Sequence, residues 1–194
     1  MATTNNGNDP VEKILCAARQ CYLKDGIGAT GMIEVARAAN VARSTLYRYF
    51  PGKDDVLVAV IKREMEITNV AIHKKLRRYQ HPADIIVEGI VLALKEIPKR
   101  PLLQAVFASD EDSKARRVIW GSDIIVQFGE QLLEHVIQPA LEQGLLQDKV
   151  PPEILVEWIY RTLLSLLTLP SNWITTDKAL RATLHALLVP VILR

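Results

Sequence analysis

The fold is decided by the stretch Ala42-Arg43-Ser44-Thr45-Leu46-Tyr47-Arg48-Tyr49-Phe50. Leu46 and Phe50 lie four residues apart, so on a helix they share one face. The remaining positions from 43 to 49 carry only Arg, Ser, Thr and Tyr, whose side chains form hydrogen bonds. The pattern predicts a short helix with a narrow buried stripe and an outer surface rich in donors. Such a surface suits a DNA groove bordered by phosphates.

A second short helix and a tight turn precede this stretch. The apolar stripe of that helix comprises Met32, Val35, Ala36 and Ala39. Thr30 stands where it can cap the helix, and Asn40 stands where a sharp turn needs a positive φ. Val41 is apolar within the turn and is expected to fill the space between two crossing helices. Two short helices joined in this way predict a helix-turn-helix.

The flanking segments complete a wholly helical chain. Asp9-Pro10 starts a first helix that Gly26 ends, and Lys53 opens a long fourth helix to about Tyr79. Proline and glycine positions divide the rest into predicted helices at residues 82–97, 101–109, 113–143, 152–169 and 176–192, with an acidic loop at residues 109–113. Gly121, Gly129 and Pro139 are candidates to bend or break the 113–143 helix. The prediction is an all-α protein of about nine helices.

Charge is distributed unevenly along the chain. Residues 1–79 contain 13 Lys or Arg and 8 Asp or Glu, a net charge of +5, whereas residues 80–194 contain 11 and 14, a net charge of −3. No Asp or Glu occurs between Ala36 and Lys53. A basic N-terminal part favours a polyanionic partner at that end of the molecule.

Residues 13–60 resemble the DNA-binding domain of the TetR family of transcriptional regulators. The most diagnostic part is the pattern Thr45-Leu46-Tyr47-x-x-Phe50-x-x-Lys53. Two positions depart from the family pattern: Ala42 replaces the usual Ser or Thr cap, and Asn40 replaces the usual Gly of the turn. The resemblance implies a cytoplasmic DNA-binding regulator, most commonly a repressor, that binds a palindromic operator as a homodimer and is released by a small effector.

The expected domain organisation follows from both lines of argument. Residues 1–9 form a disordered tail, residues 10–52 the helix-turn-helix domain and residues 53–79 a connecting helix. Residues 80–194 form a C-terminal helical bundle for effector binding and dimerisation. We expect the long connecting helix to transmit the presence of the effector to the DNA-binding domain by a population shift.

The candidate DNA contacts follow from side-chain chemistry and the resemblance. Arg43 and Ser44 are expected at base edges, and Thr45 at a thymine methyl or a phosphate. Tyr47 and Tyr49 are expected to hold phosphates through their hydroxyls, and Lys53 to hold one with the first N–H groups of its helix. The full set of predicted contacts is Thr30, Gly31, Arg43, Ser44, Thr45, Tyr47, Arg48, Tyr49 and Lys53.

The C-terminal helices suggest a dimer interface and an effector pocket. Residues 154–167 are apolar almost all round, so both sides of that helix should be covered. On the last helix, the predicted interface combines an apolar stripe and a strip of small residues: Leu180, Leu184, Leu187, Leu188, Val191, Ala179, Thr183 and Ala186. An apolar pocket for a small hydrophobic or amphipathic molecule is predicted from five residues: Phe107, Trp120, Ile124, Phe128 and Trp158. Plain core packing remains the alternative for each of them.

Other classes of protein find little support. No phosphate-binding glycine loop, nucleophile motif or metal-ligand spacing occurs, so we expect neither an enzyme nor a bound metal or cofactor. The longest apolar runs are far shorter than the roughly 20 residues of a membrane span, so no membrane partner is expected. The remaining alternative is a helical protein-interaction scaffold without DNA binding, which leaves the donor-rich stretch unexplained.

Overall fold

The computed structural model describes residues 9–107, 113–124, 127–128, 131, 133–147 and 151–194. Over these residues the chain is helical, with no β-strand beyond one isolated bridge between Leu146 and Leu193. None of the described helices is long and apolar enough to cross a membrane. The helical elements are α1 (Pro10–Asp25), α2 (Met32–Ala38), α3 (Arg43–Tyr49), α4 (Lys53–Leu76), α5 (Pro82–Glu96), the 3-10 turn η1 (Ile97–Lys99), α6 (Pro101–Phe107), α7 (Ser113–Trp120), the π-helical turn η2 (Leu133–Ile137), α9 (Gln138–Glu142), α10 (Pro152–Thr168), α11 (Asp177–Leu187) and α12 (Val189–Ile192). The all-α prediction is confirmed.

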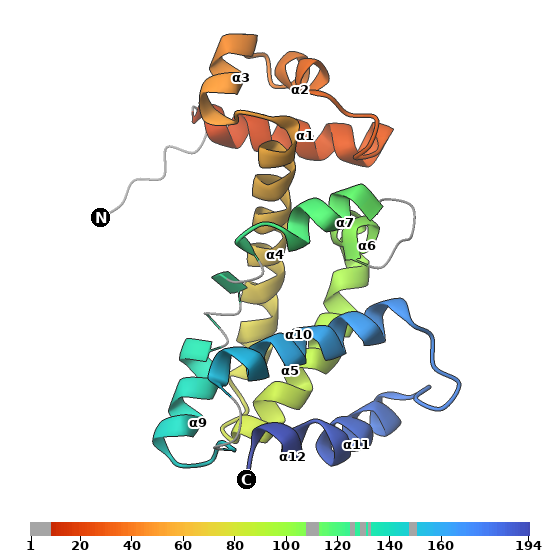
Figure 1. Ribbon diagram of the computed structural model, residues 1–194. Coiled ribbons are helices and arrows are strands. Elements are labelled where there is room, and N and C mark those ends of the chain that lie inside the picture. Colours follow the sequence, from red (N-terminus) through yellow and green to blue (C-terminus); the bar gives the residue numbers. More distant parts are fainter. Residues whose placement is uncertain (1–8, 108–112, 125–126, 129–130, 132, 148–150) are drawn as a thin grey trace.

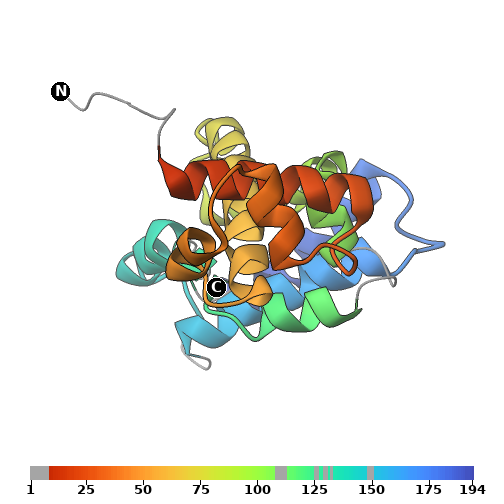
Figure 2. The same cartoon turned by 90° about the horizontal axis from the view of Figure 1, so that it is seen from above.

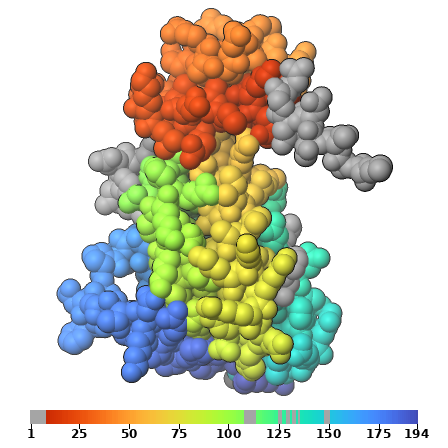
Figure 3. All heavy atoms as spheres, turned by 180° about the vertical axis from the view of Figure 1, so that it is seen from behind, coloured from red at the N-terminus to blue at the C-terminus, as the bar shows by residue number. Residues whose placement is uncertain are grey.

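The helices α1, α2 and α3 form a small head at one end of the molecule (Figure 1). Helix α4 runs from this head into a larger body formed by α5 to α12. Viewed from above, α1 to α3 cover the end of α4 (Figure 2), and from behind the head remains at one extremity (Figure 3). The donor-rich helix α3 therefore lies at an exposed end of the protein.

Two hydrophobic cores hold the molecule together. The first unites the head with α4, α6 and α7, and the second joins α5, η2 and α9 to α12. Leu103 and Val106 of α6 are fully buried in the first core, beside residues of α1 and α4. The packing of the head thus continues into the C-terminal half, beyond the predicted boundary at residue 80. The division into domains stays a prediction.

Most predicted helix boundaries are confirmed to within a few residues, but three predictions need correction. Helix α4 ends at Leu76, before Tyr79. The helix predicted over residues 113–143 is broken at the predicted candidate Gly121, because α7 ends at Trp120 and Gly121 lies in a turn. Further along, the π-helical turn η2 lies just before Pro139, which lacks the N–H needed to continue an α-helical ladder.

The last predicted helix is also divided. Helix α11 ends at Leu187, and α12 starts at Val189 with Pro190 in its first turn. The predicted tail at residues 1–8, the loop at 109–112 and Gly129 lie outside the described residues.

Candidate nucleic-acid interface and effector cavity

The turn between α2 and α3 has the predicted geometry. Asn40 adopts a φ of 52°, and no other described non-glycine residue has a positive φ. The amide of Val41 donates to the Ala36 carbonyl oxygen at 3.1 Å, which closes the turn. Leu46 and Phe50 are buried in the first core, and Val41 packs against that core. The inward face of α3 is therefore fixed to the rest of the head.

The outward face of α3 is open to solvent. Arg43, Ser44, Tyr47, Arg48 and Tyr49 are exposed, and Thr45 is partly buried beside them. Arg48 donates from Nη2 to the Tyr49 hydroxyl at 3.3 Å, and its guanidinium carbon lies 5.0 Å from the centre of the Tyr49 ring. The Tyr49 hydroxyl accepts this hydrogen bond and so keeps its own proton for another acceptor. The arrangement presents cationic and hydroxyl donors on one surface.

Helix α3 begins without a side-chain cap, as Ala42 in place of the usual Ser or Thr predicts. Ala42 occupies the N-cap with extended backbone angles and makes no side-chain capping hydrogen bond. The first N–H groups of a helix have no partner within the helix. At α3 these groups lie next to the exposed side chains of Arg43 and Ser44.

The residues predicted at the periphery of the interface make internal contacts. Thr30 is buried and donates its hydroxyl to the Gly26 carbonyl oxygen at 2.8 Å, so the predicted Thr30 cap is wrong and Gly31 is the N-cap of α2. The Gly31 amide donates to the Glu34 carboxylate at 3.2 Å. Lys53 donates from Nζ to the Gly28 carbonyl oxygen at 3.1 Å, which ties the start of α4 to the loop before α2.

A second candidate site lies between the helices of the body. An apolar space of about 90 Å³, here called the inner cavity, is lined from α4, α5, η1, α6, α7 and α10, with Phe128 nearby. Its lining residues are Met65, Thr68, Asn69, Ile72, Ala93, Ile97, Leu103, Phe107, Trp120, Phe128, Tyr160, Leu163, Leu164 and Leu167. A larger space of about 300 Å³, the outer cavity, shares six of these residues and extends toward Arg77 and Tyr79 at the end of α4.

The structure brings together three of the five residues predicted for the pocket. Phe107, Trp120 and Phe128 line the inner cavity. Ile124 is buried in the first core without lining the cavity. The prediction that Trp158 lines the pocket is wrong, because its side chain is 52% exposed. Tyr160 lines the cavity instead. A helix turns by about 200° over two residues, so the two aromatic side chains lie on opposite sides of α10.

The predicted dimer surface is partly buried within the chain. Leu184 and Leu188 belong to the second core, whereas Leu187 and Val191 are exposed. On α10, Ile154 and Trp158 are exposed as well. One side of α10 is thus covered by the chain itself and the other is open, so the predicted covering of both sides is confirmed for one side only and stays a prediction for the other.

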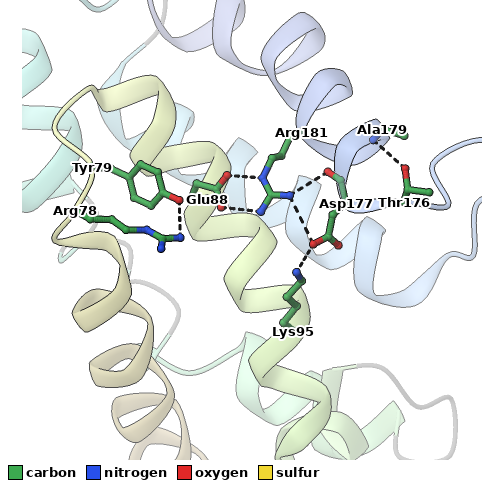
Figure 4. Close-up of polar contacts among 8 residues, drawn as sticks. All are labelled: Arg78, Tyr79, Glu88, Lys95, Thr176, Asp177, Ala179 and Arg181. Carbon is green, nitrogen blue, oxygen red and sulfur yellow. Dashed lines mark hydrogen bonds and ion pairs between the residues drawn. The ribbon is translucent and has the colours of Figure 1, made fainter.

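A polar network fastens α11 to the body (Figure 4). Arg181 of α11 donates from Nη2 to Oε2 of Glu88 on α5 at 3.0 Å, and it lies near Asp177 in the first turn of its own helix. Lys95 of α5 forms a second ion pair with Asp177. The hydrogen bonds from Arg181 hold the pKa of Glu88 below its usual value.

A buried carboxylate joins the head to the body. Glu64 of α4 is only 2% exposed and accepts hydrogen bonds from two arginines. Arg19 of α1 donates from Nε to Oε1 at 2.7 Å, and Arg100, directly before α6, donates from Nη1 to Oε2 at 3.2 Å. Thr68, one turn further along α4, donates its hydroxyl to the Glu64 carbonyl oxygen at 2.7 Å. Sequence reasoning missed this cluster, because Arg100 and Arg19 lie 36 and 45 residues away from Glu64 along the chain.

The arrangement defines a class of protein: a helix-turn-helix head with its second helix exposed, joined by one long helix to a helical body that encloses an apolar cavity. In the described part of the chain, no group of three or more His, Cys, Asp or Glu residues is placed to hold a metal ion. Comparison with known proteins supports this class. Residues 14–60 match the family model described as bacterial regulatory proteins, tetR family.

Individual relatives agree with this match. An HTH-type transcriptional regulator of Mycobacterium tuberculosis, Rv1255c, is 27% identical over 182 residues, 93% of this chain and 84% of the relative. The repressor KstR of Mycolicibacterium smegmatis is 46% identical over 55 residues, 28% of this chain and 27% of the relative. The structure of FadR from Thermus thermophilus in complex with lauroyl-CoA superposes with a TM-score of 0.65 at 20% identity, covering 93% of each chain.

Residues 14–60 are therefore similar to the DNA-binding domain of the tetR family, and the relative that matches over most of the chain is an HTH-type transcriptional regulator.

Proposed function

We propose that this protein is a repressor that binds a palindromic operator as a homodimer and is released by a small hydrophobic or amphipathic effector. The observation that carries the proposal is the exposed, carboxylate-free outer face of α3 at the tip of the head. A relative that is 46% identical to this chain over 55 residues is a repressor, which supports this sign of regulation. The function rests on three parts of the molecule: α3, the exposed side of α10 and α11, and the inner cavity.

Helix α3 supplies the proposed DNA contacts. Arg43 and Ser44, in its first turn, are placed to reach base edges, and an arginine can bind guanine through two hydrogen bonds. Tyr47 and Tyr49 offer exposed hydroxyls for phosphates, with Arg48 beside Tyr49. Thr45, partly buried, is proposed at the edge of the contact.

The flanking residues are proposed to contribute less. Lys53 can reach a phosphate only by giving up its hydrogen bond to the Gly28 carbonyl oxygen. Thr30 and Gly31 already use their hydroxyl and amide within the head. We therefore propose that Thr30 and Gly31 contribute to DNA binding indirectly, by fixing the backbone at the start of α2.

A homodimer explains how one short helix can select an operator. One α3 reads only a few base pairs, and two-fold dimers that place two such helices about one DNA turn apart are the usual solution. Exposed apolar side chains on α10 and α11, including Trp158 and Leu187, provide a surface that a second copy can cover. Covering these side chains removes apolar area from water and favours association.

The inner cavity is the proposed effector site, and α4 is the proposed link to the DNA. Met65, Thr68 and Asn69 of α4 line the cavity, and Glu64 immediately precedes them. An effector that changes the packing between α4 and α6 would alter the Glu64–Arg100 pair and, through the same carboxylate, the Arg19 contact to the head. The effector acts only to the extent that it binds one of the two arrangements more tightly.

The effector is proposed to be largely apolar, because the wall of the inner cavity is dominated by Leu, Ile, Ala, Met and aromatic side chains. The similar FadR structure from Thermus thermophilus is a complex with lauroyl-CoA, an amphipathic molecule with an apolar acyl chain and a charged CoA part. Molecules that co-purify with the protein, identified by denaturing mass spectrometry, provide the first candidates. Each candidate is then tested for its ability to weaken DNA binding.

Salt dependence tests DNA binding itself. A duplex selected from a random pool by the purified protein is titrated at increasing salt concentrations. If Arg48 and Lys53 of each subunit neutralise one phosphate apiece, a dimer neutralises four, and the slope of log K against log salt is about −4. A scaffold without DNA affinity would yield no selected duplex, and this outcome would refute the proposal.

A further inference from the structure

Tyr160 of α10 stands at the junction of the two cavities. Its side chain lines both the inner and the outer cavity, and it packs against both hydrophobic cores. Tyr160 is thus one of the six residues that a molecule extending from one cavity into the other can contact on both sides. Its phenol is one of the few polar groups in a wall that is otherwise apolar.

The other polar side chains of the inner cavity are largely engaged. The hydroxyl of Thr68 donates to the Glu64 carbonyl oxygen at 2.7 Å, and the amide of Asn69 donates to the side-chain oxygen of Gln131 at 3.4 Å. Asn69 keeps its second N–H and its Oδ1, whereas the Tyr160 hydroxyl and the Trp120 indole N–H have no hydrogen-bond partner at all among the residues that the structure describes. Both groups are donors, and Trp120 lines only the inner cavity.

The Tyr160 hydroxyl is not completely enclosed by protein atoms. Within the described chain, every fully buried side-chain nitrogen or oxygen has a hydrogen-bond partner, so an unpaired hydroxyl must be accessible. Burial of the ring raises the pKa of Tyr160 above its ordinary value, so the phenol keeps its proton at neutral pH. An accessible, protonated hydroxyl in an apolar wall is a hydrogen-bond donor available to a ligand.

We propose that the effector is an apolar molecule with a hydrogen-bond acceptor, such as a carbonyl oxygen, that accepts a hydrogen bond from the Tyr160 hydroxyl. This inference rests on the effector site proposed above and specifies the chemistry that the site selects. The apolar wall contributes affinity for any molecule of suitable size. Tyr160 adds selectivity, because an analogue without the acceptor leaves the hydroxyl without a partner.

The test compares two probes that share a phenyl ring and a two-carbon chain, acetophenone and ethylbenzene. Only acetophenone carries a carbonyl oxygen. Their affinities are measured by ligand-observed NMR titration on the full chain and on the Tyr160→Phe variant. A hydrogen bond of ordinary net strength predicts a loss of about two- to tenfold in acetophenone affinity on Tyr160→Phe, with ethylbenzene affinity unchanged or increased.

Tyr79→Phe is the matched control. Tyr79 lines the outer cavity, but its hydroxyl already accepts a hydrogen bond from Arg78 Nη2 at 2.8 Å. This variant is expected to change neither affinity by more than about twofold. Circular dichroism establishes that both variants retain the helical fold.

The outcomes separate the two proposals. If both probes bind and Tyr160→Phe affects them equally or not at all, the Tyr160 contact is wrong while the effector cavity stands. If neither probe binds the unaltered protein, the cavity fails as an effector site and the Tyr160 inference falls with it. A selective loss for acetophenone in Tyr160→Phe, absent in Tyr79→Phe, supports both.

Discussion

Replacing Glu64 with Gln is expected to weaken the junction between head and body. The carboxylate is 2% exposed and accepts a hydrogen bond from each of two arginines. A hydrogen bond to a charged group contributes about 1.5–3 kcal/mol, and removing one partner of a buried pair costs more. The side chains of Arg19 and Arg100 remain 38% and 27% exposed, so water stabilises the charges left behind. We therefore expect Glu64→Gln to lower the free energy of unfolding by about 2 kcal/mol.

Urea denaturation followed by circular dichroism measures this loss. The control is Glu12→Gln, which breaks an ion pair with Arg63 that also joins α1 to α4 but is about one-third exposed on both sides. An exposed pair contributes about 0–1 kcal/mol. If Glu64→Gln costs no more than Glu12→Gln, Glu64 does not hold the head to the body.

A double-mutant cycle examines the shared carboxylate. Arg19→Gln and Arg100→Gln remove the two donors one at a time and together. Because both bind Glu64, their effects on unfolding are expected to be non-additive by more than about 0.5 kcal/mol. Strict additivity would show that the two contacts act independently, against the proposed route between cavity and head.

Three further predictions concern the dimer surface, the polar network and the turn. Leu187→Glu is expected to shift the protein toward monomers in sedimentation experiments. The control is Val70→Glu on α4, at a site of the same 71% exposure, which is expected to leave association unchanged. Equal behaviour of the two variants would exclude α11 from the interface. The lowered pKa of Glu88 means that its contribution to stability is fully present above the ordinary pKa of 4.5 and is lost as pH falls through the lower folded value. Arg181→Gln should therefore make the stability less sensitive to acid in urea titrations between pH 7 and pH 3, and an unchanged profile would argue against the pair. Asn40 has a φ of 52°, which a valine adopts only with strain, so Asn40→Val is expected to destabilise the protein by about 1–2 kcal/mol. Asn40→Gly is expected to be tolerated. Equal melting temperatures of the two variants would contradict the strain argument.

The head could be predicted closely because its signals are local. The positive φ of Asn40 and the burial of Leu46 and Phe50 follow from residues that are adjacent in sequence. The helix periodicity and the turn chemistry each restrict a few neighbouring residues. The same reasoning failed for Thr30. Its hydroxyl donates a hydrogen bond to the nearby Gly26 carbonyl oxygen and does not cap the start of α2.

The cavity was harder to predict because it depends on contacts between distant segments. An apolar helix such as α10 has two candidate inward faces, and the sequence alone does not say which one meets the cavity. The apolar pattern predicts Trp158 as a lining residue, but Tyr160 on the opposite side lines the space. The partners of Glu64 are equally remote, and an isolated glutamate in a helix carries no signal of burial. Only the packed structure identifies these residues.

Photocrosslinking tests most directly whether the outer face of α3 contacts DNA. p-Benzoylphenylalanine is introduced at Ser44, which is exposed on α3, and separately at Val70, which is exposed on α4. Each variant is irradiated with the duplex that the unaltered protein selects. We predict crosslinks to bases from position 44 and none from position 70. Crosslinks from position 70 alone, with position 44 silent while the duplex remains bound, would contradict the assignment of α3 as the DNA-reading helix.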